Sequence, residues 1–308
     1  MAGDATTSRT DAQAKGGARP VSAVILAAGK GTRMNSDLPK VCHPVGGRPM
    51  VCAVVDACLR AGVRHIVVVV GYKQELVREA LAGYVATTIG EAGPGGSDTA
   101  DESRGPLRLE FAVQGEQLGT GHAVMSAEPA FAGQVLAGRG RDILVLCGDG
   151  PLIRDETIQR MLHRHRETGA AATLATSVID DPTGYGRIVR DASGAFQRIV
   201  EQKNASDTER AIREVNPSYY CFDGAALFGA LKQVGRNPLT GEYYITDVFE
   251  LLRAGGRRVE VIDAVPPEDV LSINTPEHLA EVDRIFRSRG NAGRTGIGAG
   301  TRPGGHHG

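Results

Sequence analysis

The sequence of 308 residues contains no tryptophan, few other aromatic residues and no long apolar run. Its apolar stretches, such as residues 23–28 and 66–70, are far shorter than the roughly 20 residues that a membrane-spanning helix needs. The formal net charge is only −1, which gives no overall field for binding nucleic acid or an anionic membrane surface. The sequence therefore predicts neither a membrane protein nor a nucleic-acid-binding protein.

Cysteine is also scarce. The five cysteines include no Cys-x-x-Cys pair and no zinc-finger spacing. Cys52, Cys58 and Cys147 lie in apolar segments, which predicts buried free thiols. Because residues 1–20 also lack the apolar core of a secretory signal, we expect a cytoplasmic protein with reduced cysteines.

Both ends of the chain are poor in residues that could form a core. Residues 1–20 contain no Val, Ile, Leu or Phe, and the last 18 residues contain seven Gly. Such segments cannot offset the entropy of ordering, so we expect disordered tails at 1–20 and 290–308, and a flexible insertion at about 86–106. Residues 287–308 carry four Arg and no acid, which is more typical of a solvated tail than of an RNA-binding one. One domain remains, at 21–289.

Short apolar runs alternate with amphipathic segments up to about residue 170. This alternation is typical of strands and helices joined by right-handed crossovers, which build a mostly parallel sheet with helices on both faces. Strand patterns dominate beyond residue 170 and predict antiparallel additions, so the expected class is α/β with a Rossmann-like sheet. The expected strands are 23–28, 65–70, 108–113, 142–147, 171–178, 185–190, 196–201, 215–222 and 258–263, and the expected helices are about 50–61, 73–82, 121–128, 158–162, 243–254 and 276–288.

Three segments follow predicted strands, at the edge of the sheet where α/β proteins bind ligands. The first reads LAAGKGTRM over residues 26–34 and continues to LPK at 38–40. Its two glycines allow a sharp turn whose backbone N–H groups can face an anion, and Arg33 and Lys40 can contact phosphate oxygens. Neither the P-loop nor the dinucleotide fingerprint fits this loop, so a plain strand-to-helix turn with solvated charges is the alternative.

The other two segments carry an acid and two amides. Asp149 follows a predicted buried strand, where one carboxylate with phosphate oxygens and waters suits Mg²⁺, and the alternative is an ordinary Gly-Asp-Gly-Pro turn. Gln114 and Gln117, in a segment rich in small residues, offer the donor and acceptor pair that a uracil edge requires. The alternative for this third segment is capping of a helix by Thr120.

The motifs LAAGKGTRM and LPK resemble the signature of the sugar-phosphate nucleotidyltransferases. Further motifs resemble the uridylyltransferase domain of bacterial N-acetylglucosamine-1-phosphate uridyltransferases, over nearly all of residues 21–289. The resemblance implies the nucleotide-diphospho-sugar transferase fold. It also implies Mg²⁺-dependent transfer of UMP from UTP to N-acetylglucosamine-1-phosphate, giving pyrophosphate and UDP-N-acetylglucosamine, a cell-wall precursor. These further motifs are EQLGTGH at 116–122, DPTGYGRI at 181–188, VEQK at 200–203 and GEYYITD at 241–247.

The resemblance implies a role for each matching residue. Arg33 and Lys40 would be catalytic and contact the UTP phosphates, while Asp149 and Asn274 would bind Mg²⁺. The remaining residues would bind the substrates: Leu26, Ala27, Ala28 and Gly29 along the nucleotide, Gln114, Gln117, Gly119 and Thr120 at the uracil and ribose, and Gly186, Glu201, Asn216, Tyr244 and Thr246 at the amino sugar.

Some positions depart from the family pattern. Pro217-Ser218 follows Asn216 where Thr-Gly is usual, and Cys147 and Gly150 flank Asp149 where bulkier residues are usual. Another sugar-1-phosphate, or dTTP, is therefore the alternative substrate, and a non-catalytic nucleotide-sugar sensor is the alternative from another class. The sequence contains no hexapeptide repeats like those of the acetyltransferase β-helix found in bifunctional relatives, so we expect no acetyltransferase activity.

Overall fold

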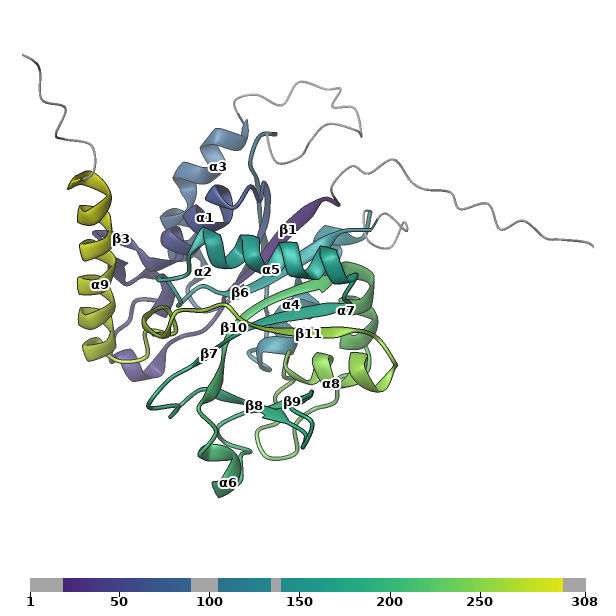
Figure 1. Ribbon diagram of the computed structural model, residues 1–308. Helices are drawn as coiled ribbons and strands as arrows, with labels where there is room; N and C mark the ends of the chain where they lie inside the picture. The colour runs from purple at the N-terminus through teal and green to yellow at the C-terminus, as the bar shows by residue number, and fades with distance from the viewer. Residues whose placement is uncertain (1–18, 90–104, 134–139, 296–308) are drawn as a thin grey trace, which may run out of the picture.

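A computed structural model describes residues 19–89, 105–133 and 140–295 (Figure 1). A nine-stranded sheet lies at the centre, with the order β11-β7-β10-β6-β1-β4-β5 and with β8 and β9 attached through β10. Each strand expected from the sequence is present, within two residues of its expected limits. The strands are β1 (Val21–Ala27), β4 (His65–Val70), β5 (Arg108–Val113), β6 (Asp142–Cys147), β7 (Ala172–Val178), β8 (Gly186–Arg190), β9 (Phe196–Val200), β10 (Glu214–Asp223) and β11 (Val259–Asp263).

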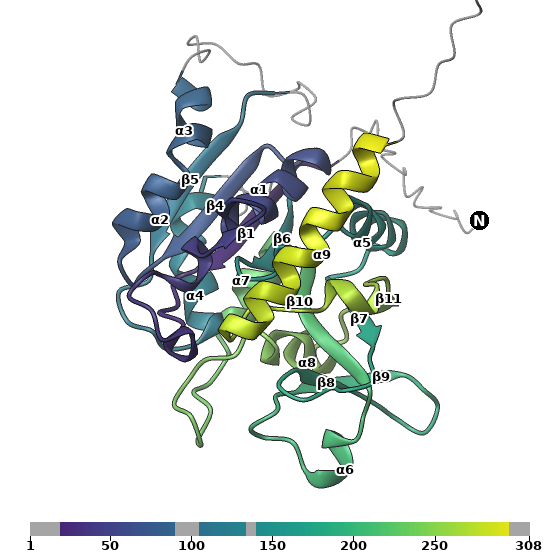
Figure 2. The ribbon, with the colours of Figure 1, turned by 90° about the vertical axis from the view of Figure 1, so that its left-hand side faces the viewer.

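The direction of the strands follows the expected division of the chain. β6, β1, β4 and β5 run parallel, as do β7 and β11. β10 lies antiparallel between β6 and β7, and the antiparallel pair of β8 and β9 extends from it. Figure 2 shows β8 and β9 with the short helix α6 (Asp207–Arg210) as a small lobe beyond the main sheet. The mostly parallel α/β sheet with antiparallel additions is confirmed.

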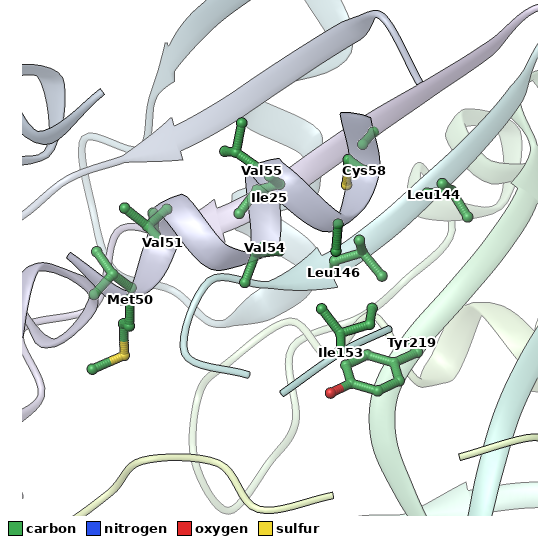
Figure 3. Packing of buried hydrophobic residues seen from close by; sticks show 14 of the residues in the cluster. Ile25, Met50, Val51, Val54, Val55, Cys58, Leu144, Leu146, Ile153 and Tyr219 are labelled. Carbon is green, nitrogen blue, oxygen red and sulfur yellow. The ribbon is translucent and has the colours of Figure 1, made fainter. Parts of the chain in front are cut away.

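Helices cover both faces of the sheet, because successive side chains of a buried strand point to opposite faces. On β1, Ile25 packs in one core with α1, and Val24 packs in the other core with α4, α7 and α8. Figure 3 shows the apolar side chains of α1 lying over the strands of the first core. The helices are α1 (Met50–Arg60), α2 (Gln74–Ala80), α3 (Ala82–Ile89), α4 (Thr120–Ser126), α5 (Asp155–Thr168), α7 (Gly224–Leu231), α8 (Asp247–Ala254) and α9 (Pro276–Thr295), and a small hairpin joins β2 (Pro44–Val45) to β3 (Arg48–Pro49).

Several helices differ from the sequence-based expectation: α5 extends well beyond the expected 158–162, α3 was not expected, and α7, α8 and α9 differ as well. α7 was not predicted, since its small and apolar residues show little periodicity. Its start is set by Asp223, whose side chain accepts a hydrogen bond from Ala226 N at 2.9 Å. α8 begins at Asp247 rather than near 243, because Tyr243 and Ile245 are hydrogen-bonded to residues 118–121 at the start of α4. α9 continues to Thr295, beyond the expected boundary at 289.

The expected insertion and tails lie largely outside the described residues. α3 occupies 82–89, so the first residues of the expected insertion are helical. Residues 1–18, 90–104, 134–139 and 296–308 are not described. The described cysteines are free thiols, and Cys147 is only half-buried where a buried thiol was expected. None of the helices in the described ranges has the length and apolar character needed to cross a membrane.

Candidate active site

Four side chains that were expected to bind phosphate and metal meet beyond the carboxyl ends of β1 and β6. The Lys40 ammonium forms an ion pair with the Asp149 carboxylate and donates to Asn274 Oδ1 at 2.8 Å. The same oxygen accepts a hydrogen bond from Arg33 Nη2, also at 2.8 Å. The structure therefore brings together two cations, one carboxylate and one amide oxygen from three separate segments of the chain.

The loop after β1 takes its shape from Gly31. This residue has φ +70°, in the left-handed region that favours glycine. A Cβ placed on Gly31 would lie 2.6 Å from Lys40 Cβ, so the loop and the Lys40 segment approach more closely than any larger residue would allow. Met34, three residues farther on, is buried and anchors the loop in the first core. Gly31 is therefore required both for the turn and for the position of Lys40.

Asp149 and Asn274 are positioned by backbone hydrogen bonds. Gly148 N donates to Leu26 O at 2.9 Å, which ties the turn after β6 to the end of β1. Ile273 N donates to Asp149 O at 3.3 Å and so places Asn274 beside the carboxylate. The Asn274 amide nitrogen donates to Ser272 Oγ at 3.1 Å, which leaves its oxygen facing the two cations.

Three adjoining cavities lie at this edge of the sheet, and Leu26 and Thr120 line all of them. We name them by what the sequence leads us to expect in each. The phosphate-side cavity, of about 380 Å³, contains Arg33, Lys40 and Asp149. The base-side cavity, of about 460 Å³, contains Gln114 and Gly119. The sugar-side cavity, of about 260 Å³, contains Glu201, Tyr244 and Thr246.

The base-side cavity is held in shape by its amide side chains. Gln117 Nε2 donates to Ala28 O at 2.8 Å, and Gln114 Nε2 donates to Gly119 O at 3.1 Å. Gly119 has φ +96°, and a Cβ there would lie 2.6 Å from Tyr243 O, so only glycine fits. The alternative for this segment, capping of α4 by Thr120, is excluded, because its hydroxyl instead accepts a hydrogen bond from Ile245 N at 3.2 Å and joins this loop to the sugar side.

The sugar-side cavity contains the half-buried carboxylate of Glu201. Thr246 Oγ1 donates to Glu201 Oε1 at 3.1 Å. Burial raises the pKa of the Glu201 carboxyl above its ordinary value, although the bond from Thr246 acts in the opposite direction. Asp247 and Glu242 add like charge nearby. Glu201 can accept hydrogen bonds from sugar hydroxyls, which is the role that the resemblance implies.

Three predicted substrate residues do not line these cavities. Ala27 is buried in the core of the sheet, so only its neighbours in the motif reach the nucleotide side. Gly186 and Asn216 face each other across β8 and β10, behind the sugar-side cavity. Asn216 Nδ2 donates to the hydroxyl of Tyr220 at 2.7 Å, and it is Tyr220 that lines the cavity.

The cavities also contain residues that sequence reasoning did not select. Lys30 lies in the phosphate-side cavity and stands between the two glycines of the first motif. Gln202 directly follows Glu201 in the motif VEQK, and Glu242 follows Gly241 in the motif GEYYITD. Their places in these motifs were the sequence signal that could have identified them. Cys147 and Ser218 also line the sugar side, and both depart from the family pattern.

Comparison with known proteins agrees with the geometry of the site. The nucleotidyl transferase family matches residues 22–266. The bifunctional protein GlmU of Geobacillus sp. (strain WCH70) is 45% identical over 267 residues, covering 87% of this chain and 52% of the relative. The bifunctional GlmU proteins of Pelotomaculum thermopropionicum and Geobacter metallireducens are 44% and 43% identical over 269 and 271 residues, covering 87% and 88% of this chain.

The chain spans about half the length of these curated relatives, 51–52% of each. The matched region nevertheless includes β1, the loop with Arg33 and Lys40, the turn with Asp149 and the whole sugar side up to residue 266. On the family match and on this identity, the chain belongs to the nucleotidyl transferase family.

Proposed function

We propose that this nucleotidyltransferase transfers UMP from UTP to N-acetylglucosamine-1-phosphate, giving UDP-N-acetylglucosamine and pyrophosphate. The observation that carries the proposal is the meeting of Arg33, Lys40, Asp149 and Asn274 at the phosphate-side cavity, of which the first three line the wall. A nucleoside triphosphate extends from a base to a chain of phosphates, and a sugar phosphate must reach the first of these. Three cavities that share Leu26 and Thr120 fit such a pair of substrates.

The chain provides charge and position rather than a nucleophile. A phosphate oxygen of the sugar phosphate attacks the α-phosphorus of UTP, and pyrophosphate leaves from the opposite side. The attacking phosphate is already ionised at neutral pH, so no side chain has to remove a proton. Two polyanions must approach each other, so neutralisation and alignment by Arg33, Lys40 and the loop amides dominate the expected catalysis.

The donor set at Asp149 and Asn274 fits Mg²⁺. Mg²⁺ prefers oxygen ligands, takes few of them from the protein and completes its shell with phosphates and waters. Asp149 supplies a carboxylate and Asn274 an amide oxygen, and the Lys40 ammonium already lies between the two. When bound, Mg²⁺ would neutralise phosphate charge at the reacting centre. Within the described ranges no group of three or more His, Cys, Asp or Glu gathers as an all-protein metal site.

The choice of an amino sugar as substrate is supported less directly than the nucleotidyl transfer itself, because it rests on the lining of the sugar-side cavity. Its motifs, VEQK and GEYYITD, place Glu201, Tyr244 and Thr246 in one cavity, as the resemblance implies. Cys147 and Ser218 line the same cavity and depart from the family pattern. That departure favours a second candidate, the same transfer with another sugar-1-phosphate.

Pyrophosphate release measured across a panel of nucleotides and sugar-1-phosphates tests the proposal. We expect the highest kcat/KM with UTP and N-acetylglucosamine-1-phosphate, and no release when Mg²⁺ is chelated. Preference for glucose-1-phosphate over its N-acetyl analogue would select the second candidate. Absence of release with every pair, despite binding of nucleotide sugar, would instead indicate a non-catalytic sensor.

A further inference from the structure

Arg187 on β8 is buried beneath the rim of the sugar-side cavity, with 1% of the residue exposed. Its guanidinium donates to the carbonyl oxygens of Tyr185 and Arg210 and to Gln202 Oε1, the last at 2.7 Å. Within the described part of the chain it forms no ion pair with a carboxylate. A buried cation surrounded by fixed carbonyl oxygens has one orientation, so Arg187 joins two loops rigidly: the turn at 181–185 and the segment after β9.

This arrangement determines which way the Gln202 amide lies. Its oxygen accepts from Arg187 Nη2 and from Gly184 N, the latter at 3.2 Å. Both partners can only donate, so the end of the amide that faces them must be the oxygen. The two N–H groups of Gln202 Nε2 then make no hydrogen bond within the described residues. They are the polar group that this side chain offers to the sugar-side cavity, which it lines together with Gly184 and Glu201.

Glu201 and Gln202 offer complementary chemistry to one ligand. Glu201 can only accept hydrogen bonds when ionised, whereas Gln202 Nε2 can only donate them. A hydroxyl group does both, so neighbouring hydroxyls of a sugar can donate to the carboxylate and accept from the amide. A purely apolar ligand would leave Gln202 Nε2 without a partner and Glu201 with only the bond from Thr246, which is costly.

We infer that Gln202 is a sugar-binding residue that donates through Nε2 to an oxygen substituent of the sugar, and that Arg187 is the positioning residue that holds it. The inference rests on the proposed function and adds to it a residue that recognises the sugar by a hydrogen bond. Neither residue was among those expected to bind substrate. Since Arg187 touches the loops and not the cavity, it acts only through Gln202 and Gly184.

The matched pair of variants is Gln202→Glu and Gln202→Leu. A glutamate keeps an oxygen for Arg187 and Gly184 but has no N–H for the sugar, whereas leucine removes both. Binding of UDP-N-acetylglucosamine and of UDP is measured by titration calorimetry for each protein. We expect both variants to bind UDP as the wild type does and to lose roughly three- to tenfold in affinity for the nucleotide sugar.

The outcomes separate this inference from the proposed function. If the wild type binds UDP-N-acetylglucosamine no more tightly than UDP, the proposed function fails and the inference fails with it. If the wild type shows the preference and Gln202→Glu retains it in full, the inference alone is overturned.

Arg187→Met and Arg187→Lys test the positioning role. We expect Arg187→Met to raise the KM for the sugar phosphate several-fold while the KM for UTP stays the same, with partial rescue by lysine. If Arg187 only supports the fold, Arg187→Met should lower the thermal unfolding midpoint and change the KM of both substrates equally. That result would overturn the assignment.

Discussion

Lys40 and Asp149 are 109 positions apart in the chain, yet their side chains form an ion pair that is 15% and 21% exposed, respectively. Lys40 also donates to Asn274, so one ammonium connects the loop after β1, the turn after β6 and the segment before α9. A cation is thus already favoured between the two oxygen donors that would bind Mg²⁺. Partial burial strengthens this attraction, because the local dielectric is lower than that of water.

Asp149→Asn should remove metal-dependent turnover while leaving the fold intact. Asparagine keeps the shape of the side chain but loses the charge that pairs with Lys40, so we expect kcat to fall by at least about 100-fold. Asp37→Asn is the control. Asp37 lies in the neighbouring loop with its side chain fully exposed, and its Oδ1 is 3.8 Å from Lys73 Nζ. Steady-state kinetics and thermal unfolding measure both effects. Unchanged turnover in Asp149→Asn would remove this residue from the mechanism.

Gly31→Ala should damage the site through Lys40. The substitution places a Cβ at φ +70° and 2.6 Å from Lys40 Cβ, so it costs about 1–2 kcal/mol of stability and displaces the ammonium. Turnover should fall roughly 10- to 100-fold.

Gly169→Ala is its matched control. Gly169 has φ +60° at the end of α5, and a Cβ there meets nothing within 4 Å. We expect the φ strain alone to lower the free energy of unfolding in urea, by no more than in Gly31→Ala, and turnover to stay normal. Equal loss of activity in both variants would contradict the role given to the contact between Gly31 and Lys40.

Glu201→Gln should stabilise the protein at neutral pH and weaken sugar binding. The pKa of this carboxyl is raised in the folded chain, mainly by burial. A carboxyl whose pKa is higher in the folded chain than in the unfolded chain makes its full contribution to stability below the unfolded pKa of about 4.3. That contribution is lost as the pH rises through the folded pKa. The neutral amide avoids that cost. Thermal unfolding at pH 7.5 should show a higher midpoint, while the KM for the sugar phosphate increases. A lower midpoint would contradict the assigned environment.

His165 should make the stability of the protein depend on pH near neutrality. Burial lowers its pKa below 6.5, although Asp142, with Oδ1 at 3.8 Å from Nε2, acts against this. Because the folded pKa lies below the unfolded one, this histidine's contribution to the free energy of unfolding is at its full value above pH 6.5. It is lost as the pH falls from there through the folded pKa. We expect His165→Gln to flatten the decline in unfolding free energy between pH 7.5 and 5.5.

The matched control for this test is His163→Gln. His163 is exposed on the same helix, two residues away. Its substitution should leave the pH dependence as in the wild type. The same flattening in both variants would show that burial of His165 is not the cause.

Ser218→Gly should stabilise the fold. Ser218 has φ +66° at the irregular part of β10, between the residues that pair regularly with β7. A non-glycine residue in this region is strained, and glycine relieves the strain at some cost in unfolded-chain entropy, for a net gain of about 1 kcal/mol. Urea unfolding measures the gain, and Ser218→Ala should show none.

Some expectations could be confirmed because their signals are local. Short, wholly apolar runs predicted β4 and much of β1 and β6, because burial on both faces makes a strand apolar throughout. The motif around Gly29 and Gly31 indicated a sharp turn, and Gly31 has φ +70°. Less local features were missed: α7 has no clear period, and residues 243–245 leave the helix because they bond to a loop about 125 positions away.

The amino-acid sequence by itself determined the fold class, the family and the identity of the two cations and the acid, because each depends on short patterns. Only the tertiary structure decided that Asn274 meets Arg33 across 241 positions, that Ala27 is withdrawn into the core, and that Arg187 orients the amide of Gln202. Such contacts depend on how loops from different strands pack at one edge of the sheet. No pattern along the chain records the direction in which a side chain finally points.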